Sequence, residues 1–268
     1  MDPTSGQLAA SQLAIASLLV LASAGASFML ALGIERLLLV ATLRMVAQLL
    51  LVGFILEWIF SLDHPAAVTL VLLTMTLIAG VSASKRTEVS YQGMLANGLF
   101  AVAAGSWAAS AIALLIVVRV HPWYTPRYAI PLVGMILGNT MNGVSLGLDR
   151  LASELLARRG QVESALALGA TRWEAALPIF RSSVRTGLIP TINTMAAAGI
   201  VTLPGMMTGQ MLAGASPIDA VKYQMVIMFL MTFAIVAGSI LAAFLAFRRL
   251  FTAEHQLDPG LLIERKQG

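Results

Sequence analysis

The chain has 268 residues, of which 58% are hydrophobic and only 11% are charged. A soluble domain carries about 25% charged residues, so this composition excludes an ordinary soluble protein and predicts that lipid surrounds most of the chain. Cysteine is absent, which excludes disulfides, thiolate metal sites and cysteine nucleophiles. The formal net charge of +4 does not indicate binding to nucleic acid, because the basic residues lie between apolar runs.

Apolar runs recur along the whole chain, and a helix that crosses a membrane needs about 20 mostly apolar residues. The runs of this length are Leu8–Leu32, Leu37–Phe60, Pro65–Ser84, Met94–Val118, Ala129–Leu148, Leu188–Gly214 and Tyr223–Phe247. We therefore expect an all-α, polytopic membrane protein with about seven transmembrane helices, organised as a single domain over residues 1–268. The first seven residues contain no Lys or Arg, so the first run is interpreted as a retained span rather than a cleaved signal peptide.

The orientation follows from the distribution of Lys and Arg, which favour cytoplasmic segments. With the N-terminus outside, three of the 17 Lys and Arg residues fall in outer segments: Arg119, Arg127 and Lys222. Arg44 lies within a span, and the remaining thirteen fall in inner segments. This asymmetry predicts a multi-pass protein of the cytoplasmic (inner) membrane with its N-terminus outside and its C-terminus in the cytoplasm.

The inner segment from Asp149 to Gly187 is about 39 residues long, charged and rich in helix-forming residues. Connections of this length without a role are uncommon. We expect an amphipathic helix ended by Gly160, a short second helix stopped by Gly169, and a third helix that begins at Thr171. Glu174 stands three residues after Thr171, which is the spacing of a capping box. The pattern predicts a rigid helix–glycine–helix elbow on the cytoplasmic side.

The elbow carries a spacing that resembles the EAA loop of ABC transporter permeases. Glu163-Ser164-Ala165 is followed after three residues by Gly169, and after nine more by Ile179. The sequence departs from the typical loop at Ser164, and Leu177-Pro178 precedes the isoleucine instead of following it. The resemblance implies that this segment, 149–187, docks into an ATPase subunit. The residues that would make this coupling contact are Glu163, Ser164, Ala165, Gly169, Ala170 and Thr171.

Longer motifs extend the resemblance over about Leu37 to Leu257. They are Ile130-Pro131-Leu132-Val133-Gly134-Met135-Ile136-Leu137-Gly138-Asn139-Thr140-Met141, Leu168-Gly169-Ala170-Thr171, Leu188-Ile189-Pro190-Thr191, Leu203-Pro204-Gly205-Met206-Met207-Thr208-Gly209 and Val221-Lys222-Tyr223-Gln224. Together they are similar to the Fet-type iron-export ABC permeases, a family that also includes plant proteins linked to aluminium tolerance. The resemblance implies a permease subunit that forms a homodimer, pairs with a separate ATPase and exports iron.

ATP hydrolysis would have to occur on that other subunit. A Walker A loop needs a Gly-Lys pair followed by Ser or Thr, and this sequence contains no Gly-Lys pair. We therefore expect a transport subunit that is not an enzyme and binds no cofactor itself, with ATP-Mg on the partner ATPase. No nucleophile and base, and no paired carboxylates, converge in the sequence. No residue set is assigned to a metal.

Polar residues at membrane depth are candidates for the translocation path, because such groups avoid lipid and face protein or a water-filled route. Asn139, Asn142 and Asn193 fall in this class. Hydrogen bonding between helices within one subunit explains them equally well.

A second candidate for the path is the segment Thr202–Gln210, where a proline and two glycines weaken helix continuity. Broken helices mark transport sites in many carriers. The candidate residues are Pro204, Met206, Met207 and Gln210. The two methionines point about 100° apart on a helix, so at most one of them would line a path.

Other functions remain open at this point. Export of an organic solute such as a nucleotide sugar is the alternative substrate within the ABC class. A gradient-driven secondary transporter would call for coupling carboxylates in mid-membrane, whereas Glu57 lies near the outer end of its span. A membrane scaffold or receptor subunit without transport is the third alternative. Co-purification of an ATPase would exclude the last two.

The predicted orientation can be tested by cysteine labelling, because the chain has no native cysteine. A cysteine at Ser5 should react with an impermeant thiol reagent added to intact cells, and one at Ser164 should react only after permeabilisation. The reverse pattern would overturn the orientation and the cytoplasmic position of the elbow.

Overall fold

The computed structural model describes residues 10–62, 64–252, 256 and 262–264 of the chain, which forms two compact units over Met1–Leu62 and Asp63–Gly268. The outer N-terminal residues of the topology prediction, and Arg265 and Lys266 of its inner charge count, lie outside the described residues.

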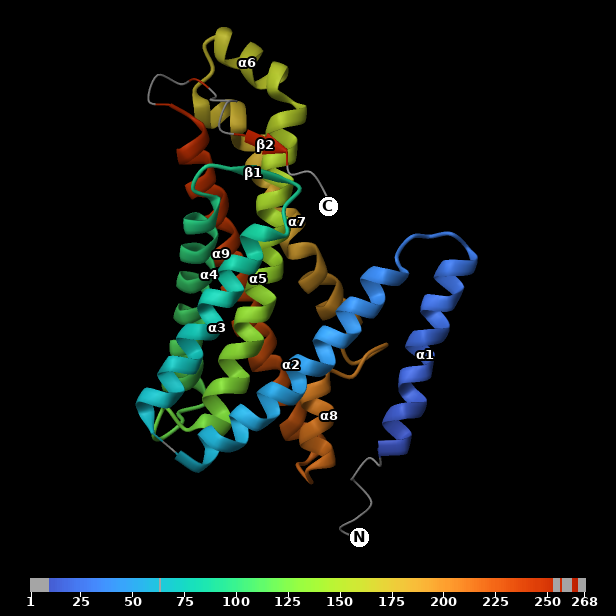
Figure 1. Ribbon diagram of the computed structural model, residues 1–268. Coiled ribbons are helices and arrows are strands. Elements are labelled where there is room, and N and C mark those ends of the chain that lie inside the picture. Colours follow the sequence, from blue (N-terminus) through green and yellow to red (C-terminus); the bar gives the residue numbers. More distant parts are fainter. Residues whose placement is uncertain (1–9, 63, 253–255, 257–261, 265–268) are drawn as a thin grey trace. The chain divides into compact units, whose positions relative to one another are not determined.

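The first unit is a helical hairpin of α1 (Ala10–Met29) and α2 (Glu35–Leu62) (Figure 1). The turn between them uses positive φ angles at Ala31 and Gly33, and the Ser27 hydroxyl donates to Glu35 Oε2 at 3.1 Å across it. Most side chains along both helices are apolar and exposed. Such an apolar surface on helices with internally satisfied backbones is suited to lipid.

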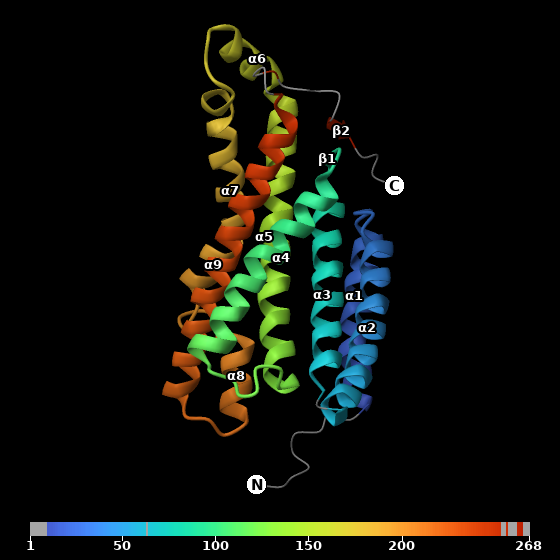
Figure 2. The ribbon, with the colours of Figure 1, turned by 90° about the vertical axis from the view of Figure 1, so that its left-hand side faces the viewer.

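The second unit is a helical bundle with short appended elements. The long helices are α3 (Pro65–Lys85), α4 (Met94–Ala111) extended by the π-helical turn η1 (Ile112–Val117), α5 (Pro126–Ala157), α7 (Arg172–Ala197) and α9 (Pro217–Leu250). The short elements are α6 (Arg159–Ala167), α8 (Gly205–Leu212) and the antiparallel strands β1 (Val89–Tyr91) and β2 (Leu262–Glu264). Figures 1 and 2 show α6 and α8 at opposite ends of this bundle.

Small residues allow the bundle helices to approach closely, which is how membrane helices gain packing energy without a hydrophobic driving force. A Cβ added at Gly105 of α4 would lie 2.7 Å from the carbonyl oxygen of Ala234 in α9. A Cβ at Gly187 of α7 would lie 2.5 Å from the carbonyl oxygen of Gly143 in α5. Both contacts are too short for any residue except glycine, so α4 is held against α9 and α5 against α7 by direct backbone contact.

The predicted fold class is confirmed, and six helices of the described chain are long and apolar enough to cross a membrane. They coincide with six of the predicted runs. The remaining run, 188–214, is not one helix: α7 ends at Ala197, and α8 begins only after Pro204. Between them the chain folds into a tight turn in which Gly199 has a φ of +81° and its N–H donates to the Thr202 carbonyl oxygen at 2.9 Å. The predicted loss of helix continuity is therefore present.

The elbow differs from its prediction in where its helices begin and end. The amphipathic run after Asp149 is the continuation of α5, and α7 starts at Arg172 and runs through the predicted boundary at Leu188. The first break occurs at Arg158, which has φ −104° and ψ 18°, whereas Gly160, the predicted stop, lies inside α6. An apolar run shows which part of a helix lies in lipid, whereas the helix itself ends where its backbone hydrogen bonds end. The helices α5 and α7 therefore extend beyond the predicted boundaries of the apolar runs.

The Gly143–Gly187 contact gives a stability prediction with a matched control in the same bundle. Gly187→Ala should destabilise the protein by about 1–3 kcal/mol, because the new methyl group overlaps a backbone oxygen that cannot move freely. Gly138→Ala, on the same helix as Gly143, meets no atom within 4 Å and should be neutral or slightly stabilising. Thermal unfolding of both variants in one detergent checks this. A Gly187→Ala protein that melts at or above wild type would contradict the close contact.

Candidate functional site in the α5–α7–α9 bundle

A small pocket with polar side chains in a mostly apolar wall lies where α5, α7 and α9 meet, and its volume of about 80 Å³ holds a few water molecules. We call it the polar pocket. Its lining residues are Asn139, Asn142, Gly143, Gly187, Pro190, Thr191, Thr194, Met228 and Met231. Three helices thus contribute amide, hydroxyl and thioether groups to one wall. The close glycine contact between α5 and α7 forms part of the same wall.

The two asparagines reach this pocket because they are three residues apart on α5 and share a helix face. Asn139 Nδ2 donates to the Met135 carbonyl oxygen at 2.8 Å and contacts Met231 Sδ at 3.3 Å. Asn142 Oδ1 accepts a hydrogen bond from Arg86 Nη1 at 2.9 Å. Both asparagine side chains are exposed in the single chain, although their helix is one of the candidate spans. The pocket is therefore open at the asparagines.

On α7 the pocket is shaped by Pro190, which lies inside the helix and supplies no backbone N–H. The Thr194 hydroxyl donates to the Pro190 carbonyl oxygen at 2.9 Å, so its oxygen keeps lone pairs for another partner. On α9, Met228 and Met231 complete the lining. The arrangement offers several neutral donors and acceptors, which can hold a polar solute or water but supply no general acid or base.

The other predicted path residues do not line this pocket. Asn193 is exposed on α7, and the remaining candidates belong to α8. Pro204 is the N-cap of α8, and its carbonyl oxygen accepts from both the backbone N–H and the hydroxyl of Thr208. Met206 packs against the apolar cluster around Ile136, while Met207 and Gln210 are half-buried. Of the predicted path residues, Asn139 and Asn142 therefore line the pocket together with residues of α7 and α9. The candidates on α8 do not line it.

Sequence reasoning did not select several residues that form the pocket. Thr191, Thr194, Met228, Met231 and the neighbouring Arg86 were not assigned to a path. Thr194 could have been found from its i+4 position after Pro190. The methionines and Arg86 carry no local signal, because only tertiary packing brings α3 and α9 to α5.

The elbow at the end of the bundle contains all the predicted coupling residues. Glu163 and Ser164 are exposed on α6, and Glu163 forms an ion pair with Arg159 at 2.7 Å. Ala165 on α6 and Ala170 after it are half-buried. Gly169 has a φ of +94°, a conformation that side chains rarely adopt, and no neighbouring atom crowds its Cβ position. Strain on substitution would therefore come from the backbone alone.

Thr171 begins α7 with the predicted capping box. Its side chain accepts from the Glu174 N–H, and its own N–H donates to Glu174 Oε2 at 2.8 Å. The Thr171 N–H and hydroxyl both donate to this carboxylate and lower the pKa of Glu174 below its ordinary value. A depressed folded pKa stabilises the cap above the ordinary carboxyl range, and this stability is lost as the pH falls through the folded pKa.

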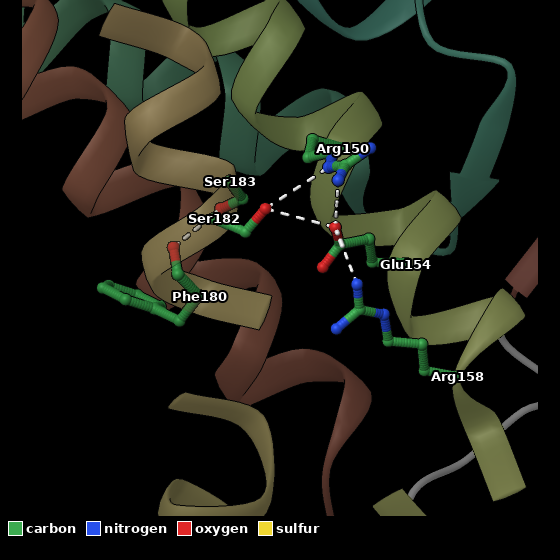
Figure 3. Close-up of polar contacts among 6 residues, drawn as sticks. All are labelled: Arg150, Glu154, Arg158, Phe180, Ser182 and Ser183. Carbon is green, nitrogen blue, oxygen red and sulfur yellow. Dashed lines mark hydrogen bonds and ion pairs between the residues drawn. The ribbon is translucent and has the colours of Figure 1, made fainter. Parts of the chain in front are cut away.

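A buried carboxylate ties the two long helices together beneath the elbow (Figure 3). Glu154 of α5 is 7% exposed and pairs with Arg150 and, at 3.7 Å, with Arg158. The Ser182 hydroxyl of α7 donates to Glu154 Oε1 at 3.1 Å, and Arg150 Nε donates to Ser182 Oγ at 3.3 Å. We call these four residues the clasp. Its polar atoms lie where α5 and α7 extend beyond the bundle. The clasp therefore joins these two helices at the point where they lead to α6.

Aromatic packing fixes the start of α7 to the end of α9. The Trp173 ring lies 5.3 Å from the Phe247 ring and 5.2 Å from the Phe180 ring. Arg172 stacks over Phe247 and donates to the Thr252 carbonyl oxygen at 3.1 Å. Neither this cluster nor the clasp was predicted. The elbow is therefore braced on two sides, by α5 through the clasp and by α9 through these rings.

The clasp can be tested by comparing its carboxylate, Glu154, with Glu163, which forms an ion pair on α6. Glu154→Gln should destabilise the protein by about 1–3 kcal/mol, because it removes charge-assisted hydrogen bonds from a buried site. Glu163→Gln removes an ion pair whose side chains are about half exposed and should cost less than about 0.5 kcal/mol. Thermal unfolding of both variants measures the difference. Equal melting temperatures would show that the clasp contributes no more than a surface pair.

Comparison with known proteins places this arrangement in a family. The profile of the uncharacterised protein family UPF0014 matches residues 10–251. UPF0014 membrane protein slr1647 of Synechocystis is 40% identical over 80% of this chain and 83% of its own. UPF0014 membrane protein STAR2 of Oryza sativa is 37% identical over 88% and 81%. The protein named "Probable iron export permease protein FetB" of Escherichia coli is 32% identical over 91% and 93%.

No solved structure matches the chain. The family match covers nearly all of the described residues, and the three relatives align over at least four-fifths of both chains. The resemblance to Fet-type permeases found in the sequence is thereby confirmed. The chain is a multi-pass membrane protein that belongs to the UPF0014 family.

Proposed function

We propose that this chain is the permease subunit of an ATP-driven ABC transporter that exports iron across the cytoplasmic membrane. Two copies would form a homodimer and pair with separate ATPase subunits, which would carry ATP-Mg. Support for the substrate comes from the relative in Escherichia coli whose name describes it as an iron export permease. The polar pocket between α5, α7 and α9 is the proposed translocation site.

The observation that carries the proposal is the elbow. A short helix, α6, is held at the end of the bundle between the extended ends of two long helices, α5 and α7. The exposed Glu163 of α6 and Gly169, whose backbone has a positive φ angle, have the spacing of an ABC coupling loop. An exposed helix braced at both ends is suited to docking against a separate subunit and to passing on its movement.

The proposal has a direct test. The tagged chain should retain a Walker A ATPase during purification, and the reconstituted complex should hydrolyse ATP and move iron across a liposome membrane. Cells that lack the chain should accumulate iron when it is supplied in excess. Absence of an associated ATPase, with unchanged cellular iron, would contradict the proposal and favour a gradient-driven carrier or a scaffold.

Two glycines of the elbow make a matched pair for testing coupling. Gly169→Val forces a valine into a φ of +94°, at a cost of about 1 kcal/mol or more, and should shift α6 relative to α7. Gly160→Val places the same side chain inside α6, where no atom lies within 4 Å and φ is not positive. We expect Gly169→Val to reduce ATP-dependent transport and ATPase association several-fold while the chain stays folded in the membrane. Equal transport by the two variants would remove Gly169 from the coupling role.

A further inference from the structure

A positively charged side chain from a fourth helix contacts one residue of the pocket lining, although it does not line the pocket itself. Arg86 is the C-cap of α3, and its Nη1 donates to Asn142 Oδ1, which belongs to the pocket lining. The Arg86 side chain is exposed, and within the described ranges no carboxylate forms an ion pair with it. The guanidinium therefore lies beside one residue of the pocket lining, with most of its five N–H donors available.

The contact with Arg86 also determines which groups of Asn142 can bind a ligand. Its amide oxygen accepts a hydrogen bond from Arg86, and the two N–H donors of its amide nitrogen remain for a ligand. An arginine fork beside amide donors is the arrangement that binds carboxylate and phosphate oxygens, because each ligand oxygen can accept several charge-assisted hydrogen bonds. Asn139 is different: its amide nitrogen is already used by Met135 and Met231.

The rest of the lining is neutral. Asparagine, threonine, methionine, proline and glycine make up the whole wall. A bare iron cation is held in proteins mainly by carboxylates and imidazoles, whereas a thioether is a soft ligand. A guanidinium next to the pocket repels a cation and attracts an anion. The charge and the donor set of this pocket therefore both fit an anionic ligand.

The position of Arg86 places this charge on the elbow side of the pocket. The C-terminal end of α3 leads directly into β1, and Figure 1 shows β1 toward the same end of the bundle as α6. The charge distribution in the sequence predicts that this end is cytoplasmic.

We propose that this pocket binds its cargo through carboxylate or phosphate oxygens and that Arg86 is the residue that selects them. Any iron that crosses through this pocket then does so as a complex with an anionic ligand and not as a bare ion. This inference rests on the proposed export function and names its substrate class. Two sources share the chemistry: an iron complex of an organic acid, and the organic anion without metal.

Binding to the purified complex of the full chain with its ATPase distinguishes these sources. The probes are Fe²⁺ alone under anaerobic conditions, citrate alone, the Fe³⁺–citrate complex and inorganic phosphate, each titrated by calorimetry. Because the pocket holds only a few water molecules, we expect citrate or its iron complex to bind with one carboxylate in the pocket, and Fe²⁺ alone to give no saturable signal. Tighter binding of Fe³⁺–citrate identifies the metal complex as the cargo, and equal binding of citrate alone identifies the anion. Failure of every carboxylate and phosphate probe to bind wild type overturns the inference.

Three variants test whether Arg86 is the residue that binds the anionic probe. Arg86→Gln should weaken binding of the anionic probe at least tenfold, whereas Lys85→Gln, which removes the adjacent charge, should leave it unchanged. Asn142→Asp keeps the contact with Arg86 but neutralises its charge, so it should also abolish anion binding without loss of folding. Saturable binding of Fe²⁺ that is the same in wild type and Arg86→Gln, or equal anion binding by Arg86→Gln and Lys85→Gln, would overturn the assignment.

Failure of the anionic-cargo inference can be distinguished from failure of the proposed export function. A complex that hydrolyses ATP and exports iron, but whose Arg86→Gln variant transports every probe like wild type, leaves the export function standing and rejects the anionic cargo. A chain that associates with no ATPase rejects the export function, and probe binding to the chain alone still decides whether the pocket takes anions.

Discussion

The backbone contact between Gly143 and Gly187 is the constraint on which the functional parts of the bundle depend. Only glycine at these positions lets α5 and α7 approach until a Cβ on one would overlap the carbonyl oxygen of the other. Both glycines line the polar pocket, so the same contact that joins the helices also forms the pocket wall. One turn further along α5, a Cβ at Gly147 would lie 3.3 Å from the Ser183 carbonyl oxygen. The clasp then continues the α5–α7 interface to the base of the elbow.

Along the α5–α7 interface of the second unit, the polar groups change from neutral to charged toward the elbow. Neutral amides and hydroxyls lie in the part of α5 and α7 that belongs to the apolar bundle, and the charged clasp lies beyond it. This order follows from the cost of burying charge, which is high in lipid and falls where water and counter-charges are near. Glu154 is nearly buried, but Arg150 and Arg158 are each about half exposed, so the carboxylate is neutralised by cations that keep contact with solvent. The clasp can therefore contain charged groups, because the buried Glu154 carboxylate is paired with arginines that solvent reaches.

Much of the fold could be predicted from the sequence because the helices are set by local properties. Long apolar runs gave six spans, the Thr171–Glu174 pair gave the start of α7, and the proline and glycines around Pro204 gave the break before α8. Prediction failed at Gly160, because a glycine surrounded by helix-forming residues is tolerated inside a helix and the chain turned at Arg158 instead. The pocket was only half predictable. Asn139 and Asn142 are unusual by composition alone, whereas Met231 and Arg86 become relevant only when α9 and α3 pack against α5.

The elbow and the pocket share α7, and the proposed function requires this helix to link them. Pro178 and Pro190 both lie inside α7, twelve residues or about 18 Å apart. Proline weakens a helix at the turn before it, so these positions are the places where α7 bends most easily. The segment between them contains Ser182 of the clasp and Gly187 of the glycine contact, and both hold α7 to α5. A force applied to α6 would reach this segment through the capped start of α7, and Pro190, at its far end, lines the pocket. Movement of the elbow would then change the pocket by bending α7 at Pro190 and not by separating α5 from α7.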